Sequence, residues 1–172
     1  MTTVSEIDPA PALVTLADLT PVHYRESFTL PITSPSSALP ITSPSSASPI
    51  TSTSGVGPAR TAEQWARLVL ERAPWKARAQ MLTAWTLLGI PLAPPWSRTQ
   101  VLGWRIVRNT PAAIVLESRA ALGITARLVF HTSGTHLTQV MLVRYDHRPG
   151  RLVWSRLAPG HRRFIRSLLS RL

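Results

Sequence analysis

The sequence predicts an α+β protein in which a long C-terminal helix covers one face of an antiparallel sheet. Residues 151–172 carry apolar side chains at spacings of three and four, as on one face of an α-helix. Residues 101–146 contain four alternating segments separated by short turns, which is typical of an antiparallel meander. Two further helical patterns precede this meander. Helices gathered on one face of an antiparallel sheet form an α+β domain.

The first 58 residues divide into three parts. Residues 1–22 show little periodicity and contain three prolines, so we expect a flexible N-terminal arm. Residues 23–30 alternate between apolar and polar side chains and predict a first strand, which Pro31 ends or confines to a sheet edge. Residues 31–58 repeat a nine-residue unit (PITSPSSAL, PITSPSSAS, PITSTSGVG), whose composition predicts a disordered Pro/Ser/Thr insertion. The domain therefore comprises residues 23–30 and 59–172.

Two shorter helices are predicted between the first and second strands. Thr61 and Gln64 have the spacing of a capping box, which predicts a helix start. Pro74 suits the first turn of a second helix that ends at Gly89. Three tryptophans spaced ten residues apart either form the lid of a pocket or pack in the core: Trp65, Trp75 and Trp85.

Four strands follow, over residues 101–108, 113–119, 124–131 and 137–146. Their alternation defines two faces. The predicted inner face is mostly apolar and holds Leu102, Trp104, Ile106, Ile114, Leu116, Ser118, Ile124, Ala126, Leu128, Phe130, Leu137, Gln139, Met141, Val143 and Tyr145. The other face is mixed, and four of its charged residues are expected to pair across strands: Arg105, Glu117, Arg127 and Arg144.

Charge and composition limit the classes of function. The net charge is +11, but residues 1–58 carry −3 and residues 59–172 carry +14, so the predicted domain should attract anions. The chain has no cysteine, which excludes disulfides and thiolate chemistry. Its histidines lack metal-ligand spacing and no glycine-rich phosphate loop is present, so we expect no metal and no cofactor. Neither a signal peptide nor a membrane span is apparent, and we expect a cytoplasmic protein.

The last helix has a basic side as well as an apolar one. Six arginines lie largely off its apolar stripe, and residues 151–172 contain no carboxylate. Such a face either contacts an anionic membrane through lipid phosphates or is simply solvated. Nucleic acid is not favoured as the partner, because aromatic side chains do not alternate with these arginines as stacking platforms would.

His161 lies on the apolar stripe of this helix, close to Pro159, which is expected to bend it. An imidazole that faces a dry cavity could orient a ligand or act as a general acid or base. The alternative is a histidine bonded to the backbone or capping the bend at Pro159 and Gly160. Ser118, Gln139 and Tyr145 pose a similar choice, between contacts with a ligand and a position near water at strand ends.

Several segments resemble a mainly actinobacterial branch of the START-like (SRPBCC) superfamily, which includes polyketide cyclases and lipid-transport proteins. The resemblance rests on TAEQWARLVLERAP, VLGWRIVRNTPAAIVLESR, ARLVF and RLVWSRLAPGHRRFIRSLL. Its landmarks are Gly103-Trp104-Arg105, Glu117-Ser118-Arg119, Trp154, Pro159, His161 and Arg162. It covers residues 23–30 and 60–172, and the nine-residue repeat departs from the family pattern.

The resemblance implies a helix-grip fold, in which a curved antiparallel sheet wraps a long C-terminal helix around an apolar cavity. It implies a binder of a hydrophobic small molecule or lipid and brings no established catalytic residues. The expected ligand-binding residues are Trp104, Leu116, Ser118, Leu128, Gln139, Met141, Tyr145, His161, Phe164 and Leu168. The alternatives are a cyclase or dehydratase that uses His161 as acid and base, or a basic module that binds anionic lipid or nucleic acid.

Overall fold

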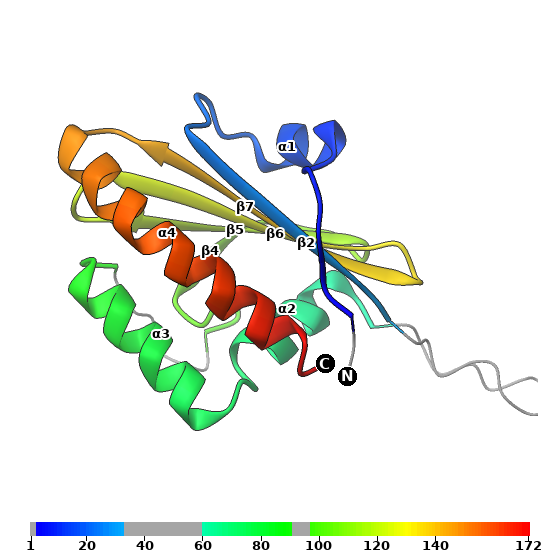
Figure 1. Ribbon diagram of the computed structural model, residues 1–172. Coiled ribbons are helices and arrows are strands. Elements are labelled where there is room, and N and C mark those ends of the chain that lie inside the picture. Colours follow the sequence, from blue (N-terminus) through cyan, green and yellow to red (C-terminus); the bar gives the residue numbers. More distant parts are fainter. Residues whose placement is uncertain (1–2, 33–59, 91–96) are drawn as a thin grey trace, which may run out of the picture.

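The computed structural model describes residues 3–32, 60–90 and 97–172, so most of the predicted Pro/Ser/Thr insertion lies outside the described residues. The described chain forms a seven-stranded antiparallel sheet in the order β1-β2-β7-β6-β5-β4-β3 (Figure 1). The strands are β1 (Ser5–Glu6), β2 (Tyr24–Pro31), β3 (Gln100–Val101), β4 (Trp104–Asn109), β5 (Ala113–Ala120), β6 (Ile124–Thr132) and β7 (His136–Tyr145). The helices are α1 (Pro11–Ala17), α2 (Ala62–Leu70), α3 (Trp75–Leu87) and α4 (Arg148–Leu169). The α+β class and the antiparallel sheet are confirmed.

The sheet brings the first long strand beside the last one. β2 pairs along its whole length with β7, with Glu26 opposite Met141 and Phe28 opposite Gln139. The meander β4 to β7 then follows in sequence order, because its short turns join neighbouring antiparallel strands. β2 thereby completes a sheet whose other long strands come from residues 104–145.

One face of the sheet carries the main core, which α2 and α4 help to form (Figure 1). α2 begins with the predicted capping box: Thr61 Oγ1 accepts from the Gln64 amide, and Gln64 Oε1 accepts from the Thr61 amide. Its buried residues include Trp65 and Val69. α4 contributes side chains at helical spacing, among them Trp154, Ile165, Leu168 and Leu169.

The opposite face is covered by α1, in the segment for which the sequence predicts an arm (Figure 1). Leu13, Ala17 and Leu19 form a second apolar cluster there with Val115, Val129, Val140 and Leu142. β1 adds two residues to the edge of the sheet beside β2. Residues 3–22 thus contain a helix and a short strand that pack on the domain. These elements escape sequence reasoning because α1 spans only seven residues.

The predicted strand over residues 101–108 is instead a hairpin of β3 and β4. Leu102 and Gly103 have φ angles of 46° and 89°, which make a tight turn between the two strands. Leu102 therefore does not belong to an alternating strand. The last helix begins three residues earlier than predicted and continues through Pro159 to Leu169.

The outer face carries the cross-strand ion pairs that the sequence predicts around Glu117. Its carboxylate lies 2.8 Å from Arg105 Nη2 and 2.5 Å from Arg127 Nη2. Arg144 differs from the prediction, since it pairs with Asp146, which directly follows the same strand, β7. None of the helices in the described parts of the chain is long and apolar enough to cross a membrane.

Candidate functional site: an apolar cavity under the C-terminal helix

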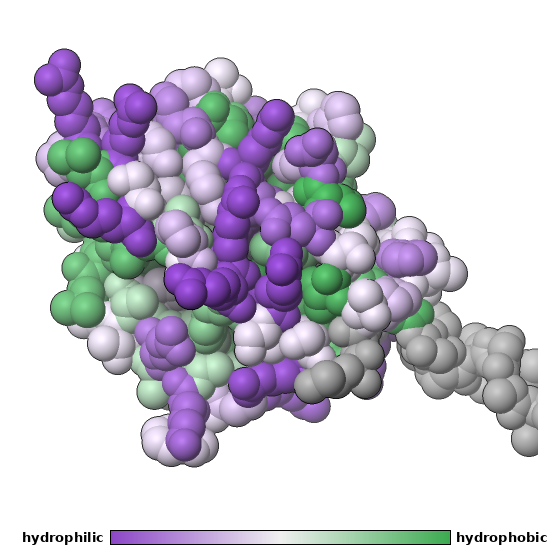
Figure 2. Space-filling view, viewed as in Figure 1, coloured by the Kyte–Doolittle hydropathy of each residue, from purple (hydrophilic) through white to green (hydrophobic). Residues whose placement is uncertain are grey.

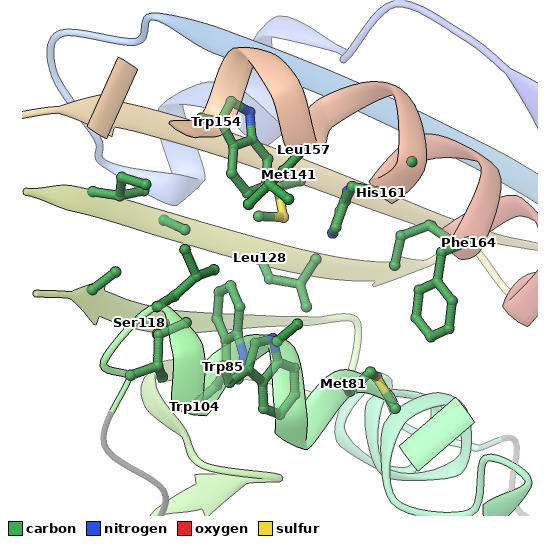
Figure 3. Close-up of a pocket in the computed structure, with 18 of the residues that line it drawn as sticks. Met81, Trp85, Trp104, Ser118, Leu128, Met141, Trp154, Leu157, His161 and Phe164 are labelled. Atoms are coloured by element: carbon green, nitrogen blue, oxygen red, sulfur yellow. The ribbon is translucent and has the colours of Figure 1, made fainter. Parts of the chain in front are cut away.

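A cavity of about 280 Å³ lies between the sheet, α3 and α4 (Figure 3). Its walls are mostly apolar side chains from seven elements, α2, α3, β4, β5, β6, β7 and α4. The lining residues are Leu70, Gln80, Met81, Ala84, Trp85, Leu88, Ile90, Trp104, Ser118, Ala120, Ile124, Ala126, Leu128, Met141, Trp154, Leu157, Gly160, His161, Phe164 and Ile165. In Figure 3, α4 supplies one wall with Trp154, Leu157, His161 and Phe164. Leu128 and Met141 form the back of the cavity, and α3 and the strands β4 and β5 supply the opposite wall.

α3 closes the cavity although it packs on the rest of the protein through few residues. Met81 is its one buried residue, and the Trp85 ring meets Trp104 edge-on with centroids 6.1 Å apart. Its end is fixed by Gly89, where a Cβ atom would lie 2.7 Å from the Cβ of Ala121. Four lining residues are exposed, and they lie on α3 and α4: Gln80, Ala84, Leu157 and Gly160. The mouth of the cavity is therefore between these two helices.

The structure brings six of the ten predicted site residues to this cavity: Trp104, Ser118, Leu128, Met141, His161 and Phe164. The other four lie elsewhere. Leu116 and Leu168 are buried in the main core, and Gln139 is buried on the same sheet face beside Phe28 and Phe130. Tyr145 stacks on His23 at the far end of β7.

Besides His161 Nδ1, three buried polar atoms of the lining residues have no hydrogen-bond partner within the described chain. These are Ser118 Oγ, Trp104 Nε1 and Trp154 Nε1, in residues that are 6%, 4% and 5% exposed. Trp104 lies one position beyond the Arg105–Glu117 pair and is therefore next to Ser118 across the two strands. A buried hydroxyl or indole N–H normally has a partner, and a ligand in the cavity could supply one.

His161 contacts a buried carboxylate behind the cavity wall. Its Nδ1 lies 2.7 Å from Oε1 of Glu26, whose side chain is fully buried. The two atoms are at hydrogen-bond distance without hydrogen-bond geometry, so the contact is mainly electrostatic. The ring of His161 extends from α4 toward the cavity, where Figure 3 places it between Leu128 and Phe164.

Glu26 belongs to a network that runs from the cavity wall to the surface. Tyr24 Oη donates to Glu26 Oε2 at 2.6 Å and accepts from Arg162 Nε at 2.9 Å. Arg162 and Arg166 both pair with Glu6 on β1. Burial and the hydrogen bond to Glu26 raise the pKa of the Tyr24 hydroxyl, while the bond to Tyr24 raises the pKa of Arg162. The network thus fixes α4 against β2 and β1.

Glu26 and Tyr24 are the site residues that sequence reasoning missed. The sequence does contain a pattern that points to them. Alternate residues of a strand share one face, and here these are Tyr24, Glu26, Phe28 and Leu30. Their partners on β7 confirm that this face is the inner one. An acidic residue at an inward position of a strand calls for a partner, and His161 and Arg162 are those partners.

The arrangement offers an imidazole backed by a carboxylate and no grouping suited to a metal. Among the described residues, no three histidine, aspartate or glutamate side chains come together. The His161–Glu26 pair can accept or donate a proton within an otherwise apolar wall. A separate depression of about 430 Å³ at the start of α4 is lined by His23, Tyr145, Asp146, His147, Arg148 and Arg151.

No protein-family model matches this chain, and neither a curated protein nor a solved structure is significantly similar to it.

Proposed function

We propose that the protein binds a hydrophobic small molecule or lipid fragment in the cavity between the sheet and α4. The observation that carries the proposal is the apolar lining together with the unpartnered polar atoms of Ser118 and Trp104. A mostly apolar cavity with a few placed polar groups is typical of small-molecule sites.

The volume defines the size of the ligand. An apolar cavity of about 150 Å³ holds benzene, so about 280 Å³ corresponds to roughly eleven heavy atoms. A fused two-ring molecule, or one end of a longer chain that leaves through the mouth, fits this limit. At about −0.5 kcal/mol per heavy atom, the dissociation constant would be on the order of 0.1 mM.

The architecture agrees with a START-like helix-grip protein. The sheet order puts β2 next to β7, and the long C-terminal helix lies over the same face as the cavity. This is the arrangement that the resemblance of residues 23–30 and 60–172 implies. It supports the binding proposal independently of the cavity lining.

Calorimetric titration with 2-naphthol tests the proposal. We expect saturable binding at one site per chain. Ala126 lines the cavity from β6, so Ala126→Phe should place a ring in the cavity and remove the binding. Ala112→Phe, at an exposed position outside the lining, is the matched control and should bind normally. Equal binding by both variants would show that the ligand lies elsewhere.

A second candidate function is docking on an anionic membrane through α3 and α4. Neither helix contains an acidic residue, and they expose Trp75, Leu87, Leu152 and Leu157 close to their arginines and lysine. Figure 2 shows strongly hydrophilic side chains along α4 with apolar surface beside them. Because the cavity opens between these helices, docking would bring its mouth to the lipid.

Co-sedimentation with vesicles distinguishes this function from simple solvation of the basic face. Vesicles that contain phosphatidylserine should retain the protein at low salt, and phosphatidylcholine vesicles should not. Trp75→Ser combined with Leu87→Ser should weaken retention, whereas Val107→Ser, at an exposed apolar position on β4, should not. Absence of retention at low salt would refute membrane docking.

A further inference from the structure

We propose that His161 recognises a hydroxyl group on the ligand, so that the cavity selects apolar molecules that carry one O–H donor, such as phenols. The inference rests on the proposed binding function and names the chemical class of its ligand. It is carried by the buried Glu26 carboxylate, which lies on the Nδ1 side of the ring, away from the cavity side.

The carboxylate determines which ring nitrogen holds the proton. Nδ1 lies 2.7 Å from the Glu26 oxygen, so a lone pair on this nitrogen would be repelled by the carboxylate even though the two atoms are not aligned as a hydrogen bond. A proton on Nδ1 turns this repulsion into attraction. In the neutral imidazole the other nitrogen, Nε2, then carries the lone pair and is a hydrogen-bond acceptor.

The groups around the pair keep Glu26 in place. Tyr24 donates to its second oxygen, and Arg162 Nε lies 3.7 Å from that same atom. The Trp154 ring packs against the imidazole with centroids 5.3 Å apart, which limits its rotation. Within the described part of the chain, Nε2 takes no hydrogen bond or ion pair.

An acceptor in an apolar wall discriminates strongly between ligands. A ligand hydroxyl satisfies Nε2, whereas a methyl group of the same size leaves the nitrogen buried without a partner. Two other unpartnered polar atoms of the lining, Ser118 Oγ and Trp104 Nε1, lie across the cavity from α4, so they do not compete for the same ligand group (Figure 3). Trp154 Nε1 is on α4, but an indole N–H only donates and cannot accept the ligand O–H.

The test compares 2-naphthol with 2-methylnaphthalene, which have the same number of heavy atoms and differ in the hydroxyl alone. Wild-type protein should bind 2-naphthol about tenfold more tightly. His161→Leu should lose this preference and still bind 2-methylnaphthalene. Tyr145→Phe, a change outside the cavity, should keep the preference.

Nitrogen NMR of the imidazole gives a second readout that needs no ligand. The His161 signals, identified by their loss in His161→Leu, should show a protonated Nδ1 and an unprotonated Nε2 at slightly alkaline pH. Glu26→Gln should shift the protonation toward Nε2. A proton on Nε2 in the wild-type protein would overturn the proposal.

The outcomes separate the two proposals. Equal affinity for both ligands in wild-type and His161→Leu protein would overturn hydroxyl recognition and leave hydrophobic binding intact. Failure of both ligands to bind would refute the binding function and hydroxyl recognition with it.

Discussion

Glu26 is a buried acidic residue whose neighbours come from its own strand and from α4. Its two oxygens face His161, Tyr24 and Arg162, so a single carboxylate positions the polar wall of the cavity and joins β2 to α4. Charged groups are rarely buried unless they are paired in this way. At the residue scale, the polar character of the cavity wall comes from the His161–Glu26 pair and from the unpartnered atoms of Ser118 and Trp104.

Replacing Glu26 by glutamine should destabilise the protein by about 2 kcal/mol, because the buried hydrogen bond and ion pairs lose their charge. Glu6→Gln is the matched control, since Glu6 pairs with Arg162 and Arg166 at the surface. That change should cost about 0.5 kcal/mol. Urea unfolding followed by tryptophan fluorescence measures both. Equal losses would contradict the importance of the buried carboxylate.

Glu117 makes the protein sensitive to acid. Burial acts to raise the pKa of its carboxyl group, but Arg105, Arg127 and Arg119 outweigh this effect and lower the pKa below the ordinary value of 4.5. A lowered pKa stabilises the folded state above pH 4.5, and this contribution is lost as the pH falls through the folded-state pKa.

Wild-type stability should therefore decrease as the pH is lowered below about 4.5, and Glu117→Gln should show a smaller decrease over the same range. Urea midpoints measured from neutral pH down to pH 3 provide the test. Parallel curves for the two proteins would mean that other groups control the acid response.

At the scale of elements, periodicity predicts the structure wherever the pattern is local and long. The amphipathic pattern of α4 and the alternation of β5, β6 and β7 are of this kind, and the capping box at Thr61 marks the start of α2 correctly. α1 has too few residues to show a helical pattern, and the β3–β4 turn depends on the positive φ of Leu102. Neither feature leaves a clear signal in the sequence.

α1 should contribute to stability, since it covers an apolar sheet face. Leu13→Ala should cost about 2 kcal/mol, because Leu13 packs against the cluster that includes Val129 and Leu142. Thr15→Ala, at an exposed position of the same helix, should change the stability little. Thermal unfolding measures both variants, and equal melting temperatures would show that α1 does not support the domain.

At the scale of the whole molecule, the candidate site depends on elements that are distant in sequence. Six of the expected ligand-binding residues line the cavity. They could be predicted because strand alternation identifies the inner face of the sheet and helical spacing identifies the apolar stripe of α4. Gln139 and Leu116 share that face but are covered by the core, and sequence cannot say how far along each strand a cavity extends. The apolar residues of α3 are spread around the helix among polar ones and form no single stripe, so its pattern does not identify the face that closes the cavity.

The two methionines of the cavity provide the most direct test that it binds a ligand. Met81 on α3 and Met141 on β7 both line it, and the chain has three methionines in all, so a spectrum of ¹³C-methyl-methionine protein is simple. Met81→Leu and Met141→Leu assign the signals. We expect 2-naphthol to shift both cavity methyl signals, and both shifts should follow the same saturation curve. In the Ala126→Phe protein neither signal should shift. Saturation with neither signal shifted would contradict a ligand site between the sheet and α4.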